Sequence, residues 1–363
     1  MAGNTLAVSE QLQILSYNVF MRPLVKTNES DYKDLRLEEL IKVWKERKFD
    51  IICLQELFST GSKRMDRLLG EFSNEKGWNY IHLSSWWRKM KPIDSGLSIL
   101  SRFPIIEKDA MVFTQGSDID GYTTKGVISA LIDLSSSEKK QHLLVFNTHT
   151  QANYDLQNAK YWEIQQSQFS EMALFILEKR KQHPGVPMVL CGDLNVDARN
   201  KNEWYHWMMK QLLDINNEEA SHAETLKISL TKTLPEGHLL TQSTLPTPKT
   251  EFNNTKQFRI TDLILEKLGS HPITFGDVIE EMMDNQEKIE KPKEVHLTHP
   301  HTLCTKERLD YILLLKDKDV TDITSLQCND CAVEPFFRQP IDKDFPCTQL
   351  SDHYGVSAKL YFE

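Results

Sequence analysis

Residues 188–195 read Met-Val-Leu-Cys-Gly-Asp-Leu-Asn, an apolar run that ends in two polar side chains, Asp193 and Asn195. A short apolar run of this kind is typical of a strand buried inside a domain. Alternate side chains of an extended chain lie on the same side, so we expect Asp193 and Asn195 to present a carboxylate and an amide together. The alternative is a turn, because Asp and Asn are also common turn formers.

Four further polar signatures lie at comparable strand ends elsewhere in the chain. They finish at Asn18, Glu56, His149 and the dipeptide Asp352-His353. Each has an ordinary explanation by itself, such as a surface carboxylate, a hydrogen-bonded core histidine or a charged loop. Their joint occurrence favours one site at the edge of a sheet. Carboxylate and amide oxygens suit a hard divalent cation, and imidazoles supply acid–base groups, which together is the chemistry of phosphodiester cleavage.

The spacing of apolar residues predicts alternating helices and strands. A helix is expected over 35–48 before a strand over 50–54, and a long helix over 161–181 before the strand that ends at Asp193. The stretch 218–306 is polar and is expected to be an elaborated insertion. Strand character resumes over 309–315 and 354–362. The pattern predicts one domain over 11–363, a mixed α/β sandwich with helices on both outer faces.

The composition limits the possible partners and compartment. Of the 363 residues, 40% are hydrophobic and 26% charged, as in a globular domain, and the formal net charge is −9. This charge argues against a nucleic-acid partner, which would normally require a basic surface. The chain contains neither an apolar stretch of the ~20 residues that span a bilayer nor a recognisable signal peptide, so we expect a cytoplasmic protein.

The six cysteines are scattered along the chain. Cys328 and Cys331 form an isolated C-x-x-C without a second pair at zinc-site spacing. This pattern favours ordinary free thiols over a metal or redox site.

Several segments resemble the endonuclease/exonuclease/phosphatase superfamily, which has the fold of DNase I, and within it the neutral sphingomyelinases. The matching segments are Asn18-Val19-Phe20-Met21, residues 50–58 with 66–70, residues 94–105, Lys125-Gly126-Val127 and residues 148–152. The resemblance implies a four-layer α/β (α+β) sandwich, in which two mixed β-sheets pack face to face with helices on both outer faces.

The resemblance also implies roles for individual residues. Glu56 would be the principal ligand of Mg²⁺, for which Mn²⁺ or Co²⁺ could substitute, and Asn18 would lie beside it as a second residue of the metal site. Asp193 and Asn195 would position the phosphate and the attacking water, and Asp352-His353 would supply the general base, His353. His149 would contact the phosphate, with Asp94 as its partner. Asp310 would support a catalytic neighbour, and Lys125 would bind substrate.

The implied reaction is hydrolysis of sphingomyelin to ceramide and phosphocholine, of the phospholipase C type. A nuclease, a phosphatase for soluble metabolites and an inactive binding module are the alternatives, and the sequence does not separate sphingomyelin from lysophospholipid. We expect a monomer that contacts the membrane peripherally. Phe336-Phe337 is the favoured contact because its position matches that of an aromatic hairpin in bacterial relatives, and Trp86-Trp87 is the second candidate.

Overall fold

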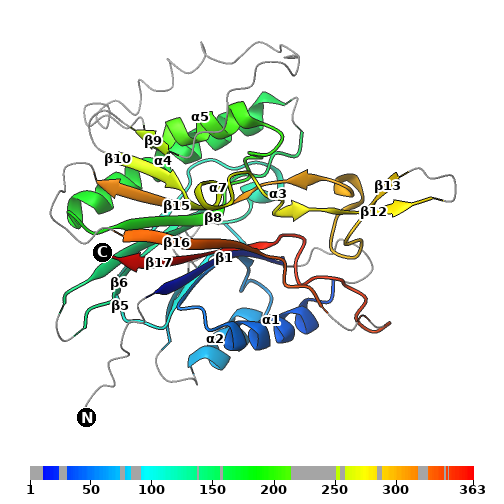
Figure 1. The fold of residues 1–363 in the computed structure, drawn as a ribbon, viewed down its shortest axis with the longest axis horizontal. Coiled ribbons are helices and arrows are strands. Elements are labelled where there is room, and N and C mark those ends of the chain that lie inside the picture. Colours follow the sequence, from blue (N-terminus) through cyan, green and yellow to red (C-terminus); the bar gives the residue numbers. More distant parts are fainter. Residues whose placement is uncertain are drawn as a thin grey trace.

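The computed structural model describes residues 11–23, 31–73, 78–82, 91–136, 139–155, 158–213, 251–253, 258–283, 288–317, 326–338, 341 and 343–363. Two large mixed β-sheets pack face to face, and helices cover both outer faces (Figure 1). The fold class predicted from the sequence is therefore confirmed. No helix within the described ranges is both long and apolar enough to cross a bilayer.

The first sheet has six strands and mixed pairing, because β1 is parallel to β2 and antiparallel to β17. Its strands in spatial order are β16 (Leu326–Glu334), β17 (Gly355–Phe362), β1 (Leu12–Met21), β2 (Ile51–Leu57), β4 (Ser98–Ser101) and β3 (Asn79–His82). Helices α1 (Lys33–Arg47) and α2 (Arg64–Ser73) cover its outer face (Figure 1). Leu37, Leu40 and Trp44 of α1 are buried there with alternate residues of β1 and β2.

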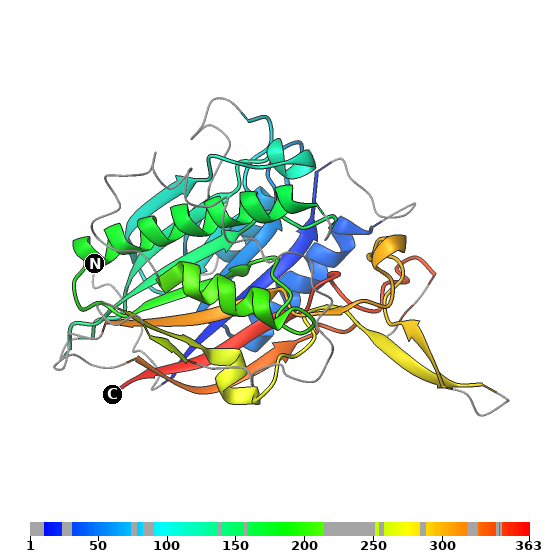
Figure 2. The same cartoon turned by 90° about the horizontal axis from the view of Figure 1, so that it is seen from above.

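The second sheet has seven strands, and β7 is parallel to β8. Its strands in spatial order are β5 (Ile105–Val112), β6 (Gly126–Asp133), β7 (His142–His149), β8 (Met188–Asp193), β15 (Asp310–Asp317), β10 (Phe258–Asp262) and β9 (Glu251–Asn253). Helices α4 (Ala159–Gln182) and α5 (Asn202–Leu213) lie across its outer face (Figure 2). The long helix predicted over 161–181 corresponds to α4.

The interface between the sheets forms the central core. Ile14, Ile51 and Cys53 of the first sheet pack in one buried cluster with Val189 and Ile312 of the second. Strands buried on both faces read as continuous apolar runs instead of alternating ones. This explains why the segments before Glu56 and Asp193 lack regular alternation.

The stretch 218–306 contributes to the sandwich as well as projecting from it. Strand β10 pairs with β15 in the second sheet, and helix α7 (Leu263–Leu268) places Leu263 and Ile264 in the core between the sheets. The hairpin of β12 (Val278–Met282) and β13 (Lys288–Pro292) projects from one end of the molecule (Figures 1 and 2). The described residues of this stretch are therefore only partly peripheral.

Strand order brings the polar signatures to one edge. His149 and Asp193 are paired residues at the ends of the parallel strands β7 and β8, and Asp193 is also paired with Asp310 at the start of β15. On the first sheet, Asn18 of β1 lies beside the end of β2, and β17 begins two residues after His353. Parallel strands that end together make this clustering a consequence of topology.

Candidate active site

Asp193 is at the centre of the candidate site. Its carboxylate is 1% exposed, and its Oδ2 atom lies 3.6 Å from His149 Nε2 and 3.7 Å from His353 Nε2. The amide of Asn18 donates a hydrogen bond to the same oxygen at 2.9 Å. One buried oxygen therefore faces two imidazoles, one at the end of β7 and the other just before β17.

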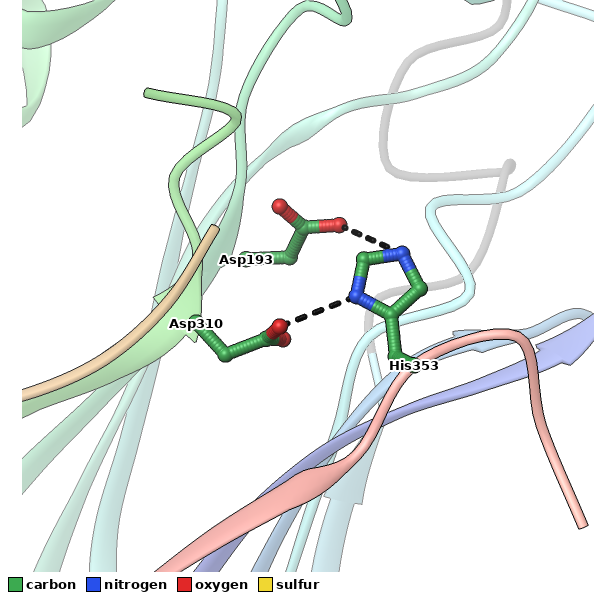
Figure 3. Close-up of side chains that lie close together, drawn as sticks. All are labelled: Asp193, Asp310 and His353. Carbon is green, nitrogen blue, oxygen red and sulfur yellow. Dashed lines mark hydrogen bonds and ion pairs between the residues drawn. The ribbon is translucent and has the colours of Figure 1, made fainter. Parts of the chain in front are cut away.

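His353 is held from its other side by Asp310. Its Nδ1 atom lies 2.9 Å from Asp310 Oδ2, and Asp310 is fully buried (Figure 3). Because a carboxylate only accepts hydrogen bonds, Nδ1 carries the proton and Nε2 faces Asp193. Burial lowers the pKa of His353, but the carboxylates of Asp310 and Asp193 outweigh it, so this pKa lies well above the usual value. The Asp310 carboxylate thus fixes both the orientation and the tautomer of the ring.

Burial raises the pKa of Asp193 to about 7, because the ionised form loses its hydration. The positive charge of His353 and the hydrogen bonds from Asn18 and Asn195 oppose this shift, whereas Asp310 adds to it. Asp193 therefore changes its charge near neutral pH when no cation is bound, which is typical of a functional site.

Glu56 lies at the end of β2 in a left-handed conformation, with φ of 57°. Gly96 makes room for this turn, because a Cβ atom at position 96 would lie 3.0 Å from the Glu56 Cα atom. The Oε2 atom of Glu56 is buried, lies 3.6 Å from Arg22 Nε and accepts no hydrogen bond from the described residues. An incompletely satisfied buried carboxylate oxygen is a suitable ligand for a hard cation.

Asn18 bridges the two carboxylates as a donor. Its Nδ2 atom lies 3.2 Å from Glu56 Oε1 and 2.9 Å from Asp193 Oδ2, whereas its Oδ1 atom accepts the backbone N–H of Phe20. In this arrangement the amide oxygen is not directed at Glu56. Asn18 therefore orients the carboxylates, and its predicted position beside Glu56 is the one observed.

His149 receives a hydrogen bond from Lys125. The Lys125 ammonium lies 3.1 Å from His149 Nε2, 2.7 Å from the carbonyl of Thr150 and 3.0 Å from Asp120 Oδ1. An ammonium only donates, so His149 Nε2 accepts and the imidazole is neutral. Burial and the Lys125 charge hold the pKa of His149 well below its usual value. Lys125 is itself buried behind His149, a place suited to orienting the ring, and its direct contact with substrate stays a prediction.

Asn195 differs from the prediction in its backbone. We expected an extended chain with Asp193 and Asn195 side by side, but β8 ends at Asp193 and Asn195 has φ of 48°. The N–H of Asn195 donates to Asp193 Oδ1 at 3.0 Å, and its side chain donates to the carbonyl of Thr150 at 3.1 Å. This is the turn geometry that Asp and Asn favour, and it still places Asn195 beside Asp193.

Two other aspartates surround the site. Asp352 is buried next to His353, and burial raises its pKa to about 6. The carboxylate of Asp94 accepts hydrogen bonds from Ser59, Thr60 and Gly96. Asp94 thus fixes the loop that follows Glu56. The predicted pairing with His149 is wrong in this structure, since His149 Nδ1 has no hydrogen-bond partner among the residues described.

The polar stretch 218–306 contains two residues of the site that the sequence did not reveal. Thr274 is fully buried, and its hydroxyl accepts the N–H groups of both Leu309 and Asp310. The ring of Phe275 lies 4.9 Å from that of His353. An isolated Thr-Phe pair in a polar stretch carries no sequence signal of this kind, because the contact exists only after the chain returns to the sheet edge.

The aromatic pair at 336–337 is divided between core and surface. Phe336 is 6% exposed and packs on Tyr17 with ring centroids 4.9 Å apart, so its predicted membrane contact is wrong. Phe336 adopts a left-handed backbone (φ 46°), whereas Phe337 is 49% exposed, with Lys293 Nζ 4.4 Å from its ring. Trp86 and Trp87 lie outside the described residues.

Known proteins share both the sequence pattern and the fold. Residues 15–353 match the Endonuclease/Exonuclease/phosphatase family. A sphingomyelinase of Dictyostelium discoideum is 30% identical over 92% of this chain and 75% of its own length. The crystal structure of beta toxin from Staphylococcus aureus superposes with a TM-score of 0.58, at 22% identity, over 96% of this chain and 99% of that one. A variant of beta toxin with bound magnesium ions has a TM-score of 0.56, at 19% identity, over 97% of this chain and all of that one.

The chain belongs to the endonuclease/exonuclease/phosphatase family and, within it, to the sphingomyelinases. It is accordingly an enzyme of the phosphodiester hydrolase class.

Proposed function

We propose that this enzyme is a magnesium-dependent phosphodiesterase that hydrolyses sphingomyelin to ceramide and phosphocholine. The observation that carries the proposal is the buried Asp193 carboxylate between His149 and His353, next to the incompletely satisfied oxygen of Glu56. Sphingomyelin is the substrate class because the Dictyostelium relative, which matches almost the whole chain, is a sphingomyelinase.

Glu56 is the residue that we assign to the cation. Asp193, Asp310 and His353 also bring possible ligand atoms within 4.8 Å of one another. However, Asp310 is fully buried and already engages His353, whose positive charge would repel a cation. Glu56 instead offers a buried carboxylate oxygen that accepts no hydrogen bond from the described part of the chain, and the magnesium ions of the beta toxin variant support this metal. A bound cation would screen the charge that develops on the phosphate and on the departing alkoxide.

His353 is the proposed general base. Its Nδ1–H is held by Asp310, which leaves Nε2 to take a proton from the attacking water. The raised pKa of His353 would keep Nε2 protonated in the absence of other charges. A cation held by Glu56 would oppose a second positive charge on His353, and so would lower this pKa towards the range in which the base is neutral.

The remaining residues position the phosphate and the water. Asn195 and Asp193 lie in one turn, and neutral His149 is oriented by Lys125. Because His149 Nε2 accepts from Lys125, contact of this nitrogen with a phosphate oxygen requires a shared or transferred proton. The 3.1 Å hydrogen bond would let the Lys125 proton be shared with a phosphate oxygen while His149 stays neutral.

The substrate class is tested by supplying several phosphodiesters to the same preparation. The full chain with magnesium is incubated separately with vesicles of sphingomyelin, phosphatidylcholine or lysophosphatidylcholine, with plasmid DNA and with inositol phosphates. We expect phosphocholine release from sphingomyelin above all. Nicking of DNA or release of inorganic phosphate, with intact sphingomyelin, would instead favour a nuclease or a phosphatase on the same scaffold.

A further inference from the structure

Two cysteines that the proposed chemistry does not use, Cys328 and Cys331, face each other on β16 with their Sγ atoms 3.5 Å apart. Residues three positions apart in a regular strand lie on opposite faces, because side chains alternate. Here the pairing with β17 shifts between Cys328 and Asp330, and no residue of β17 is opposite Asn329. The additional residue is a β-bulge, and it turns both thiols to the same face.

The pair lies at the rim of the core between the sheets. Both cysteines pack in the cluster that contains Leu263 and Ile264 of α7. Strand β16 is an edge strand of its sheet, so one side of it is not covered by another strand. Cys328 is 8% exposed and Cys331 is 5% exposed. These small exposed fractions are the access that an oxidant would use.

Three other cysteines, Cys53, Cys191 and Cys347, are fully buried. Cys53 and Cys191 contact each other across the core, and this contact and burial raise the pKa of Cys53 well above its usual value. The chain thus contains two neighbouring cysteine pairs that differ in accessibility. The Cys53–Cys191 pair provides an internal control for Cys328 and Cys331.

The two thiols of the β16 pair are not equivalent. The contact with Cys331 lowers the pKa of Cys328 despite burial, and Lys267 adds to this effect. The same contact and burial raise the pKa of Cys331. Cys328 consequently has the greater thiolate character, which makes it the nucleophile of the pair.

We propose that Cys328 and Cys331 form a dithiol that a hydroperoxide converts reversibly into an intramolecular disulfide. The Cys328 sulfur attacks a peroxide oxygen, the O–O bond breaks, and the leaving oxygen departs as water after protonation. The Cys331 sulfur then attacks the resulting sulfenic acid, the S–O bond breaks, and the hydroxyl leaves as water with the Cys331 proton. With hydrogen peroxide, two thiols lose two electrons and two protons, and the peroxide becomes two molecules of water.

The disulfide would close a small ring across the bulge, at a distance from the catalytic edge. Cys328 is opposite Leu360 near the end of β17, whereas Glu334 is opposite Gly355, next to His353. Oxidation would therefore fix the bulge of an edge strand without a direct contact to a site residue. This inference does not depend on the proposed function.

The experiment uses the full chain with Cys304→Ser, because Cys304 is exposed and would react independently. The folded protein is treated with equimolar hydrogen peroxide, quenched with catalase, denatured, alkylated and mapped by mass spectrometry. We expect Cys328 and Cys331 to lose alkylation together and to appear in one peptide that is lighter by two hydrogen atoms. Dithiothreitol should restore both thiols, while Cys53 and Cys191 remain alkylated throughout.

Single substitutions separate the two steps. In Cys331→Ser, Cys328 should stop at a sulfenic acid that dimedone traps, whereas in Cys328→Ser the Cys331 thiol should stay reduced. Two results would overturn the proposal. In one, both cysteines remain fully alkylated after treatment of the folded protein. In the other, the disulfide forms only when the peroxide is added in urea.

Discussion

The hydroxyl of Thr274 accepts the backbone N–H of Asp310 at 3.2 Å, in addition to that of Leu309 at 2.9 Å. The carbonyl of Thr274 accepts the N–H of Tyr354, the residue after His353. One buried, uncharged residue thereby connects the strand that begins with Asp310 to the segment that carries His353. These connections set the geometry in which Asp310 holds the imidazole at 2.9 Å.

Thr274→Val should lower kcat without a matching change in KM. The substitution keeps the β-branched shape but removes the side-chain acceptor of two buried N–H groups, which costs about 1–3 kcal/mol of stability for each group left unsatisfied. A shift of Asp310 by a fraction of an ångström would reduce turnover by up to ~10²-fold. Thr274→Ser keeps the hydroxyl and should retain most of the turnover. A loss of turnover in Thr274→Ser, with turnover retained in Thr274→Val, would show that the methyl group, and not the hydroxyl, is important.

Glu56→Gln should abolish magnesium binding, as measured by titration calorimetry, and reduce turnover by at least ~10²-fold. The substitution preserves the size of the side chain and removes the charge of the incompletely satisfied oxygen. Glu38→Gln is the matched control, because Glu38 lies on the surface of α1 and pairs with Arg67. Unchanged magnesium affinity in Glu56→Gln would show that other residues bind the cation.

Asp193→Asn should inactivate the enzyme and yet make the metal-free protein more stable at pH 8 than the wild type. The folded-state pKa of Asp193, about 7, is raised above its ordinary value of 3.8. The folded protein therefore binds this proton more tightly than the unfolded chain, and the stability it contributes is lost as the pH rises from about 4 through 7. The amide of asparagine avoids that loss.

The measurement for Asp193→Asn is urea unfolding in the presence of a chelator at pH 5 and pH 8. We expect the stability of the variant relative to wild type to increase from pH 5 to pH 8. A difference that is the same at both pH values would contradict the buried, proton-binding carboxylate.

Phe336→Ala and Phe337→Ala should have opposite consequences. Removing buried Phe336 should destabilise the fold by about 3–5 kcal/mol, the usual range for a core phenylalanine. Removing exposed Phe337 should leave the unfolding free energy almost unchanged and weaken binding to sphingomyelin vesicles, while hydrolysis of a soluble chromogenic phosphodiester continues. If Phe337→Ala leaves vesicle binding unaffected, Phe337 is not part of the membrane contact.

The catalytic edge was predictable from the sequence because its side chains end apolar strands. Asp193 and His149 can be recognised in the sequence because each follows a continuous apolar run. These runs are strands buried on both faces, and as parallel strands they end at one edge. The turn at Asn195 was not predictable from alternation, because the chain leaves the strand at Asp193. Backbone conformation decides such cases, and an Asp-x-Asn sequence is compatible with both a strand and a turn.

Contacts between segments distant in the sequence were also not predictable from the sequence. Thr274 looks like one of many polar residues until the fold brings it to Asp310. Phe336 and Phe337 have the same side chain, and only the left-handed backbone at Phe336 shows which one enters the core. The contact between Cys328 and Cys331 was not predictable either, because the bulge that makes them neighbours depends on the register with β17.

In the proposed mechanism, His353, held by Asp310, activates water for magnesium-dependent hydrolysis of sphingomyelin. The most direct measurement is phosphocholine release from sphingomyelin vesicles by the wild type and by His353→Gln, each with magnesium and with excess chelator. We expect release by the wild type that stops with chelator and returns with magnesium, and a loss of ~10²-fold or more in the folded variant. Full release by the wild type in chelator, or by His353→Gln with magnesium, would contradict this mechanism.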